Sequence, residues 1–341
     1  MEYGAIDLHL RHSEIRIVSE TGAVLLERRI VTTPAALRTV FGERAPMRVL
    51  IESATESEWV AQTLEGWGHE VIVADPNYLL MYAERTRRIK TDRRDVAALA
   101  EACRLGIYRR AHRVSPEQRA QRRELRVREQ LVRMRTQAIN LLRAQLRQEG
   151  YRLPSGRAES VVSRVRRLEL PTSLTAALQP LLDLLAHVHG TLATADHRAS
   201  AQAAADPVVR RLMTVPGIGP ITALTFRATL DDVGRFRDAG RASAYVGLVP
   251  SEDSSGERRQ RSRITKRGPT TLRSLLVQAA WVVWRHRATG GALHAWVEQL
   301  AARRKRPVAI VALARRLTRI LYAMWRDGTD YRPGTVRPRV A

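Results

Sequence analysis

The stretch RRIKTDRRDVAAL, residues 87–99, holds two acids three residues apart within a run of bases. On a helix Asp92 and Asp95 lie on one face, so their carboxylates point toward the same place. Two like charges at this spacing cost free energy unless a cation lies between them or one is protonated. The pattern indicates either a metal-binding pair or a solvated helix start whose charge the neighbouring arginines neutralise.

Two further acids stand at the ends of apolar strands. Asp7 in YGAIDL and Glu52 in MRVLIES are unusual there, because strand interiors disfavour Asp and strand ends open into clefts. If the two strands are neighbours, Asp7, Glu52, Asp92 and Asp95 form a cluster of four carboxylates. Such a cluster suits Mg²⁺, which prefers oxygen ligands. Two ions about 4 Å apart would hold the attacking and leaving oxygens of a phosphodiester.

A second constellation lies in GLVPSEDSSGERRQRSRITKRG, residues 247–268. Ser254 and Ser255 precede Gly256 in a predicted loop, and six bases follow: Arg258, Arg259, Arg261, Arg263, Lys266 and Arg267. A serine hydroxyl needs activation to act as a nucleophile, whereas flanking arginines bind a phosphate and stabilise its developing charge. From its residues alone, this segment is a basic phosphate-binding loop in which the serines form turns.

The segment TVPGIGPITA, residues 214–223, is similar to a helix-hairpin-helix turn. Gly217 and Gly219 would let the backbone approach a phosphate closely, and the following helix would present free N–H groups to it. The alternative is a tight turn between two packed helices.

The elements that must position the four acids precede residue 106. Strands are expected at 3–8, 13–19, 22–31, 47–53 and 69–76, and helices at 34–41, 56–67 and 91–105. Strands followed by alternating strand and helix predict a mixed sheet with covering helices. Acids on the first and fourth strands with a helical D-x-x-D resemble the ribonuclease H-like fold of RuvC-type nucleases.

Long helices are expected to follow. One spans 116–149, and a second begins near 171 with apolar residues in an unbroken 4-3 alternation, which predicts a coiled-coil seam: Leu174, Leu178, Leu181, Leu185, Val188, Leu192 and Ala195. The seam requires a partner helix in the same chain or another one, and Pro180 is expected to kink or restart the helix. The fold class is therefore α/β plus α, with expected domains at 1–112, 113–205 and 206–341, the last mainly helical.

The formal net charge of the 341-residue chain is +24, and it is unevenly distributed. Residues 1–83 carry a net −5, so residues 84–341 carry +29. This field predicts a polyanionic partner, because neutralised phosphates release counterions. A GC-rich genome would explain 55 Arg against 3 Lys, but not the excess of bases over acids.

Cys103 is the only cysteine, which excludes disulfide frameworks and thiolate zinc sites. The start, MEYGAIDLHL, lacks a signal sequence, and no apolar run is long enough to cross a membrane. A cytoplasmic protein is expected.

Taken in order, seven stretches resemble the transposases of the insertion-sequence family numbered one hundred and ten, which are bridge-RNA-guided recombinases. These stretches are AIDLH, VLIESATESEW, EVIVADPN, RIKTDRRDVAALAEA, TVPGIGPITA, YVGLVPSEDSSGERR and RITKRGPTTLRSLLVQAAW. They run in family order over nearly the whole chain, and their ordered set is specific where no single motif would be.

The resemblance implies a RuvC-like domain whose DEDD acids, here Asp7, Glu52, Asp92 and Asp95, bind Mg²⁺. It implies that Ser255 of the SG motif is the nucleophile that joins covalently to DNA, with Ser254 as a second candidate. It further implies a structured noncoding guide RNA that pairs with donor and target DNA. Family members act as dimers and tetramers in which the acids of one subunit meet the serine of another.

One departure from the family pattern affects the metal ligands. Many relatives have a Gly after EAT, whereas this chain has ESATE, so Glu56 and Glu58 compete with Glu52 for the metal assignment. Two other functions stay open. One is a Holliday-junction endonuclease of the RuvC type, in which water attacks the phosphate, and the other is an inactive nucleic-acid-binding protein.

Overall fold

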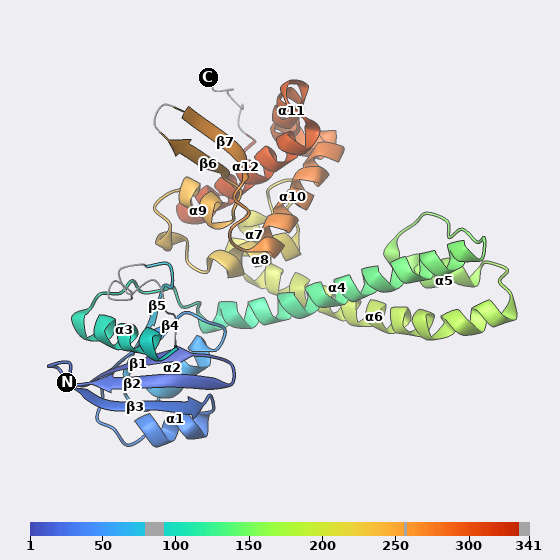
Figure 1. Ribbon diagram of the computed structural model, residues 1–341. Helices are drawn as coiled ribbons and strands as arrows, with labels where there is room; N and C mark the ends of the chain where they lie inside the picture. The colour runs from blue at the N-terminus through green and yellow to red at the C-terminus, as the bar shows by residue number, and fades with distance from the viewer. Residues whose placement is uncertain (79–91, 256–257, 334–341) are drawn as a thin grey trace. The chain divides into compact units, whose positions relative to one another are not determined.

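The computed structural model describes the chain except residues 79–91, 256–257 and 334–341 (Figure 1). For residue 92 and for residues 252–255 and 258–262 it describes the backbone alone. The chain forms two compact units, Met1–Val114 and Ser115–Ala341. The predicted first boundary was residue 112. The predicted boundary at residue 205 lies inside the second unit and stays a proposal.

The first unit is built on a five-stranded mixed sheet in the order β3-β2-β1-β4-β5. β1 is antiparallel to β2 and parallel to β4, and β4 is parallel to β5. The predicted mixed sheet is therefore confirmed, as are its elements: β1 (Tyr3–Leu8), β2 (His12–Val18), β3 (Val24–Val31), α1 (Pro34–Phe41), β4 (Arg48–Glu52), α2 (Ser57–Glu65), β5 (Glu70–Ala74) and α3 (Asp92–Leu105).

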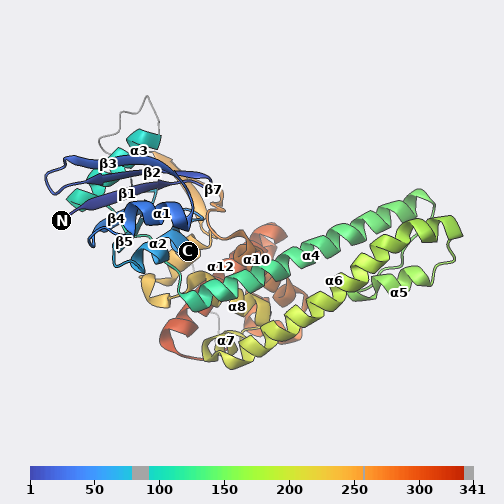
Figure 2. The same cartoon turned by 90° about the horizontal axis from the view of Figure 1, so that it is seen from below.

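Helices cover both faces of this sheet. Successive strand residues point to opposite sides, so each strand contributes side chains to both layers. Ile6 of β1 and Ile51 of β4 pack with α1 and α2 in one core. Ala5 of β1 and Leu50 of β4 pack with Val96, Leu99 and Cys103 of α3 in the other. Figure 2 shows α3 on one side of the strands and α1 and α2 on the other. The register thus fixes which side chains face α3.

The second unit begins with a long helical hairpin made of α4 (Pro116–Gln148) and α6 (Thr172–Ala205), with η2 (Ala158–Ser160) and α5 (Val161–Arg166) between them (Figure 1). Leu178 and Leu185 of the predicted seam are buried with Ile139, Leu142 and Leu146 of α4. The partner helix of the seam is therefore α4 of the same chain. α6 continues through Pro180 as one helix, so the predicted restart there was wrong.

The remaining helices of the second unit surround one core (Figure 1). They are α7 (Pro207–Leu212), α8 (Pro220–Leu230), η3 (Val233–Arg235), α9 (Ala239–Tyr245), α10 (Thr270–Arg285), α11 (Arg287–Arg303) and α12 (Arg306–Asp327). The buried hydroxyl of Tyr322 donates to the carbonyl of Phe236 at 2.6 Å, which ties α12 to the segment before α9. Within the part of the chain that the structure describes, no helix combines the length and apolarity that a membrane crossing requires.

A two-stranded antiparallel hairpin, β6 (Pro250–Ser255) and β7 (Arg258–Ile264), projects from these helices. The prediction of a loop was wrong for these residues. Apart from Pro250 and Ile264 at their base, both strands are polar, so they lack the apolar alternation by which a half-buried strand is recognised.

Candidate active site

Asp7 and Glu52 lie at the carboxyl ends of two neighbouring parallel strands. Ile6 of β1 pairs with Ile51 of β4, and each acid is the next residue of its strand. Adjacent strands lie about 4.8 Å apart. Ala5 and Leu50, two residues earlier, face α3, so Asp7 and Glu52 are on that same face. The structure therefore brings these two predicted site residues together at one edge of the sheet.

Asp95 lies in the first turns of α3, the helix that covers this face. Its side chain is 7% exposed, and the adjacent Val96 and the later Leu99 are buried against the sheet. Arg93 pairs with Glu27 of β3. The solvated helix start considered from the sequence is therefore wrong for Asp95. Asp92 is the first residue of α3, and its side chain lies outside the described part of the structure.

The surroundings of Asp7 are partly open. Its side chain is 13% exposed, and His9 places Nε2 3.5 Å from Asp7 Oδ2. Among the described side chains, no three of the His, Cys, Asp and Glu type stand close enough together to hold a metal ion. Asp7, Glu52 and Asp95 therefore lie on the same side of the sheet without forming a metal-binding group by themselves, and the side chain of the fourth predicted ligand, Asp92, is not described.

The two glutamates that competed with Glu52 contact other groups. Glu56 Oε2 accepts a hydrogen bond from Trp59 Nε1 at 2.6 Å. Glu58 accepts two hydrogen bonds of 3.0 Å from Arg113, which also binds Glu65 and so fixes the end of the first unit to α2. The hydrogen bonds to Glu65 and Glu58 raise the pKa of the Arg113 guanidinium above its usual value.

One carboxylate at the same sheet edge was not singled out from the sequence. Asp75 follows β5, and its Oδ1 accepts hydrogen bonds from the backbone N–H and the side-chain amide of Asn77, both at 2.9 Å. Its Oδ2 binds Arg109 at 2.5 Å. The Asn77 N–H and the Arg109 guanidinium hold the pKa of Asp75 below its usual value. The DPN turn signal in the sequence could have identified it.

Ser254 and Ser255 are the last two residues of β6. In the ladder, Ser254 is paired with Arg259 and Ser255 with Arg258. The side chains of these four predicted site residues are outside the described part. At the other end of the hairpin, Arg263, Lys266 and Arg267 are exposed.

The base of this hairpin is held closely against α9. The N–H of Lys266 donates to the carbonyl of Gly247 at 3.2 Å, and the N–H of Thr265 to that of Val249 at 2.9 Å. Gly268 has a φ of +97°, and a Cβ there would lie 2.0 Å from the carbonyl oxygen of Tyr245. The hairpin therefore leaves the helical core from a fixed base.

The VPGIGP segment forms the turn between α7 and α8, as predicted for packed helices. Gly217 has a φ of +82°, and a Cβ there would lie 2.7 Å from the carbonyl oxygen of Ala279 in α10. The backbone at Gly217 therefore lies close to α10 in the helical core. A Cβ on Gly219, the residue before α8, would meet nothing within 4 Å. Of the two predicted phosphate-binding glycines, Gly219 is the one next to open space.

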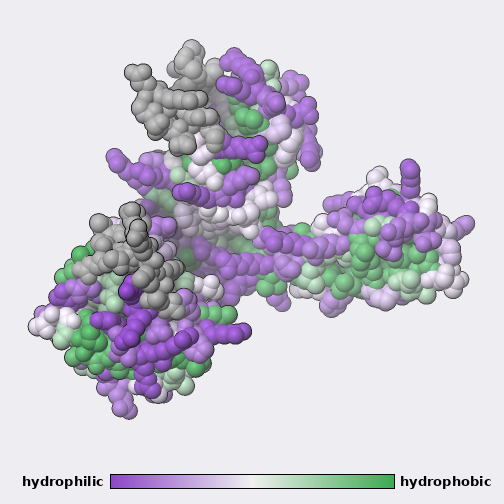
Figure 3. All heavy atoms as spheres, viewed as in Figure 1, coloured by the Kyte–Doolittle hydropathy of each residue, from purple (hydrophilic) through white to green (hydrophobic). Residues whose placement is uncertain are grey.

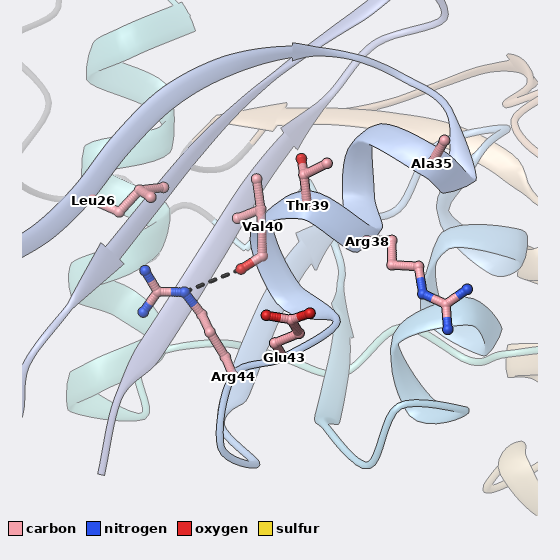
Figure 4. Close-up of a pocket in the computed structure, with 7 residues that line it drawn as sticks. All are labelled: Leu26, Ala35, Arg38, Thr39, Val40, Glu43 and Arg44. Atoms are coloured by element: carbon pink, nitrogen blue, oxygen red, sulfur yellow. Dashed lines mark hydrogen bonds between the residues drawn. The ribbon is translucent and has the colours of Figure 1, made fainter.

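A hollow of about 540 Å³ lies on the other side of the first unit, beside α1 (Figure 4). Arg44 crosses it, donating through Nε to the carbonyl of Val40 at 3.0 Å and through a terminal nitrogen to Glu2 at 2.9 Å. α1 covers the sheet face opposite to α3. This hollow is therefore separate from the carboxylates Asp7, Glu52 and Asp95.

Comparison with known proteins agrees with this arrangement. Residues 5–150 match the DEDD transposase profile of IS110 elements, and residues 209–295 match the profile of the transposase IS116/IS110/IS902 family. A probable family 20 transposase of Pseudomonas aeruginosa is 33% identical over 307 residues, covering 88% of this chain and 90% of the relative.

Two further relatives are transposases for named insertion sequences. That of IS1328 from Yersinia enterocolitica is 29% identical, with 96% of this chain and 97% of the relative covered. That of IS1111A from Coxiella burnetii is 27% identical, with 93% and 87% covered. The two profiles match in the same order as the two units, and the first relative is similar over nearly its whole length. The chain therefore belongs to the IS110 family of transposases, and it is an enzyme that recombines DNA.

Proposed function

We propose that this transposase excises and inserts its own element by Mg²⁺-dependent strand exchange through a serine-linked intermediate. The observation that carries the proposal is the position of Asp7 and Glu52 at adjacent strand ends on the face covered by α3, where Asp95 is buried. The strand order β3-β2-β1-β4-β5 supports the predicted likeness to the ribonuclease H-like fold.

Asp7, Glu52, Asp92 and Asp95 would hold the metal. The donor chemistry of the described members fits Mg²⁺, since all are carboxylates. The engagement of Glu56 with Trp59 and of Glu58 with Arg113 supports Glu52 as the ligand from this segment. Bound Mg²⁺ supplies Lewis-acid polarisation of a phosphate oxygen.

The serine segment would perform the exchange itself. The oxygen of Ser255 forms a bond to phosphorus while a bond from phosphorus to a deoxyribose oxygen breaks, and the serine proton ends on the released hydroxyl. In the second step a hydroxyl of the recombining strand attacks the same phosphorus, and the serine regains a proton. Exposed Arg263, Lys266 and Arg267 at the base of the hairpin would neutralise the flanking phosphates.

The first prediction tests the serine with its neighbour as a matched control. Ser255→Ala is expected to reduce strand exchange about a thousandfold or more, because it removes the nucleophile. Ser254→Ala is expected to stay within about threefold of the parent enzyme. Recombination is measured on donor and target DNA, and a denaturing gel detects protein joined to DNA. DNA and RNA binding should be unchanged in both variants.

Two results would contradict this assignment. Full recombination by the Ser255→Ala variant would remove the serine mechanism. Free cut ends without any protein–DNA adduct would instead support hydrolysis by water, as in a RuvC-type junction endonuclease. Loss of recombination on chelation of Mg²⁺, with binding retained, would exclude an inactive binding protein.

We further propose that a noncoding RNA guides the enzyme to donor and target DNA. The charge of +29 over residues 84–341 supports a second polyanion beside DNA. In such a system base pairing reads the sequence and the protein holds the backbones. A noncoding stretch beside the gene whose loops complement the element junction and the insertion site is the expected signature.

We propose that copies of the chain associate along α4. The seam of α6 is occupied within the chain, so it leaves no free face for a second copy. Val127, Met134 and Leu141 are exposed at intervals of seven residues, which places them in one stripe along α4. Figure 3 shows hydrophobic and hydrophilic surface on different sides of the arm that α4 and α6 form. This stripe supports a dimer, and pairs of dimers would bring donor and target together.

A further inference from the structure

A hollow of about 620 Å³ lies at the end of the helical hairpin where α4 finishes. Asn140, Arg143, Arg147, Arg152 and Leu153 line it. The first three residues have i, i+3, i+7 spacing and therefore lie on one face of α4. The last two come from the segment that follows the helix.

This following segment is folded back onto α4 by specific contacts. The chain turns at Gly150, whose φ is +79°, and the N–H of Tyr151 donates to the carbonyl of Leu146 at 2.8 Å. Leu153 packs against the core of the hairpin. Arg152, between these two anchored residues, is therefore held beside the arginines of the helix.

The far side of the segment is fixed as well. Arg164 of α5 binds the carbonyl of Pro154, and it donates to the carbonyl of Arg157 at 2.7 Å and to Ser160 at 3.2 Å. Arg147 Nε donates to the carbonyl of Arg143 at 3.2 Å, which limits the orientation of its guanidinium. The backbone around the hollow is thus fixed in the free protein, so ligand binding has to order side chains but not the chain itself.

The charge of the hollow is entirely positive. No acid lines it, and among the described residues none of its three arginines forms an ion pair. The nearby Glu159 is bound by Arg135 at 3.0 Å and faces Arg157 at 4.0 Å. The three guanidinium groups are exposed and have no counter-charge among the described residues, so an anion that approaches them meets uncompensated positive charge.

We infer that this hollow is a binding site for the phosphate backbone of nucleic acid, outside the active site described above. Guanidinium groups bind phosphate oxygens in pairs, and Asn140 adds an amide donor. Among the described lining residues Leu153 alone is apolar, which does not suit a small apolar ligand, since such ligands are bound mainly by apolar surface. The inference rests on the proposed function, because a transposase must hold its nucleic acid beyond the reacting phosphates.

The test uses the full chain and measures binding rather than recombination. The variant replaces Arg143, Arg147 and Arg152 by Gln. The matched control replaces Arg126, Arg166 and Arg167 by Gln, which removes the same charge from exposed arginines of the same unit that do not line the hollow. Affinity for a DNA duplex and for an RNA duplex of the same sequence is measured at several salt concentrations.

We expect the hollow variant to lose about ten- to a hundredfold in affinity at 100 mM salt for at least one duplex, and its slope of log K against log salt to fall by about 2. The control is expected to lose less than about threefold. A larger loss with the RNA or with the DNA duplex tells which backbone occupies the hollow. A third variant with Lys at the three positions keeps the charge and should keep most of the slope.

Equal losses in the hollow variant and the control would overturn the inference, because general charge alone would then account for binding. Unchanged affinity in the hollow variant for both duplexes would overturn it as well. Both results are independent of strand exchange. Failure of the serine mechanism would leave them unaffected, since the Ser255→Ala enzyme can be used in the same binding measurement.

Discussion

Single carboxylates at the edge of the first sheet differ in the groups that hold them. Asp75 is fixed by Asn77 and Arg109, whereas Asp7 keeps a partly open position beside His9. Each of the three parallel strands has an acid within one residue of its carboxyl end: Asp7 in β1, Glu52 in β4 and Asp75 after β5. Asp75 therefore has a structural role in the local backbone, which its hydrogen bonds to Asn77 and Arg109 define.

Asp75 gives a prediction for the pH dependence of stability. Its pKa is lowered in the folded state, so its ionised form stabilises the first unit at pH values above the unfolded pKa of about 3.9. That contribution is lost as the pH falls through the lower, folded pKa. Asp75→Asn keeps the shape of the side chain, should destabilise the unit by about 1–3 kcal/mol at pH 7, and should flatten the acid part of the profile.

Cys103 offers a measurement that reports on the first unit alone. It is the only cysteine, it is fully buried between α3 and the sheet, and burial raises the pKa of its thiol to about 12. Labelling by a disulfide reagent that reacts in acid, in increasing urea at each pH, gives the free energy of opening. Identical profiles for the parent and Asp75→Asn chains between pH 3 and 5 would contradict the assigned role. Arg104 also lowers the pKa of Glu101, and this acid dependence of stability is the same in the parent and in the Asp75→Asn variant.

Helices and strands were predictable from the sequence where their buried residues recur at regular intervals along the chain. The strands of the first unit alternate or are continuously apolar, and the helix seams repeat every three or four residues, so their positions were correct within a few residues. The β6–β7 hairpin has polar residues on both faces and gives no such signal. The partner of the α6 seam also had to come from the structure, because a pattern defines an apolar face and not what covers it.

The turn between α7 and α8 illustrates the same limit. A glycine in the sequence shows that something approaches closely, but not which group. At Gly217 the group is the backbone of α10, whereas Gly219 borders open space. The DPN turn marks Asp75 in the sequence, but its pairing with Arg109, 34 residues further along the chain, is visible only in the structure.

These two glycines make an element-level prediction with a built-in control. Gly217→Ala should destabilise the second unit by about 2 kcal/mol or more, because its φ is +82° and its new Cβ would meet Ala279. Gly219→Ala should cost less than about 1 kcal/mol. Thermal unfolding measures both. If Gly219 binds phosphate, its variant loses DNA affinity while its stability is kept, and unchanged affinity would remove the helix-hairpin-helix interpretation.

At the scale of the whole molecule, the acids and the serine belong to different units of the chain. Residues 1–83, which include Asp7 and Glu52, carry a net −5, but residues 84–114 add +6, so the first unit is nearly neutral at +1 and the second unit, with the serine hairpin, carries +23. A strongly positive unit attracts DNA at any metal concentration, whereas a nearly neutral one adds little attraction of its own. The second unit therefore supplies most of the attraction to DNA, and under the proposed function the active site is completed on assembly.

Mixing two inactive variants tests whether one active site combines residues of two different chains. Under the proposed function, Asp7→Asn removes a metal ligand and Ser255→Ala removes the nucleophile, so each variant alone is expected to be inactive. If the acids of one subunit meet the serine of its partner, a mixed dimer contains one intact site, and an equal mixture should recover up to about a quarter of the parent activity.

The stripe on α4 supplies the control for this experiment. Met134→Glu with Leu141→Glu in both chains should abolish the recovery by placing like charges in the proposed contact between copies. Differently tagged chains that copurify would establish that mixed oligomers form. Copurification without any recovery of activity would then mean that each serine acts with the acids of its own chain, because every chain in the mixture lacks one of the two.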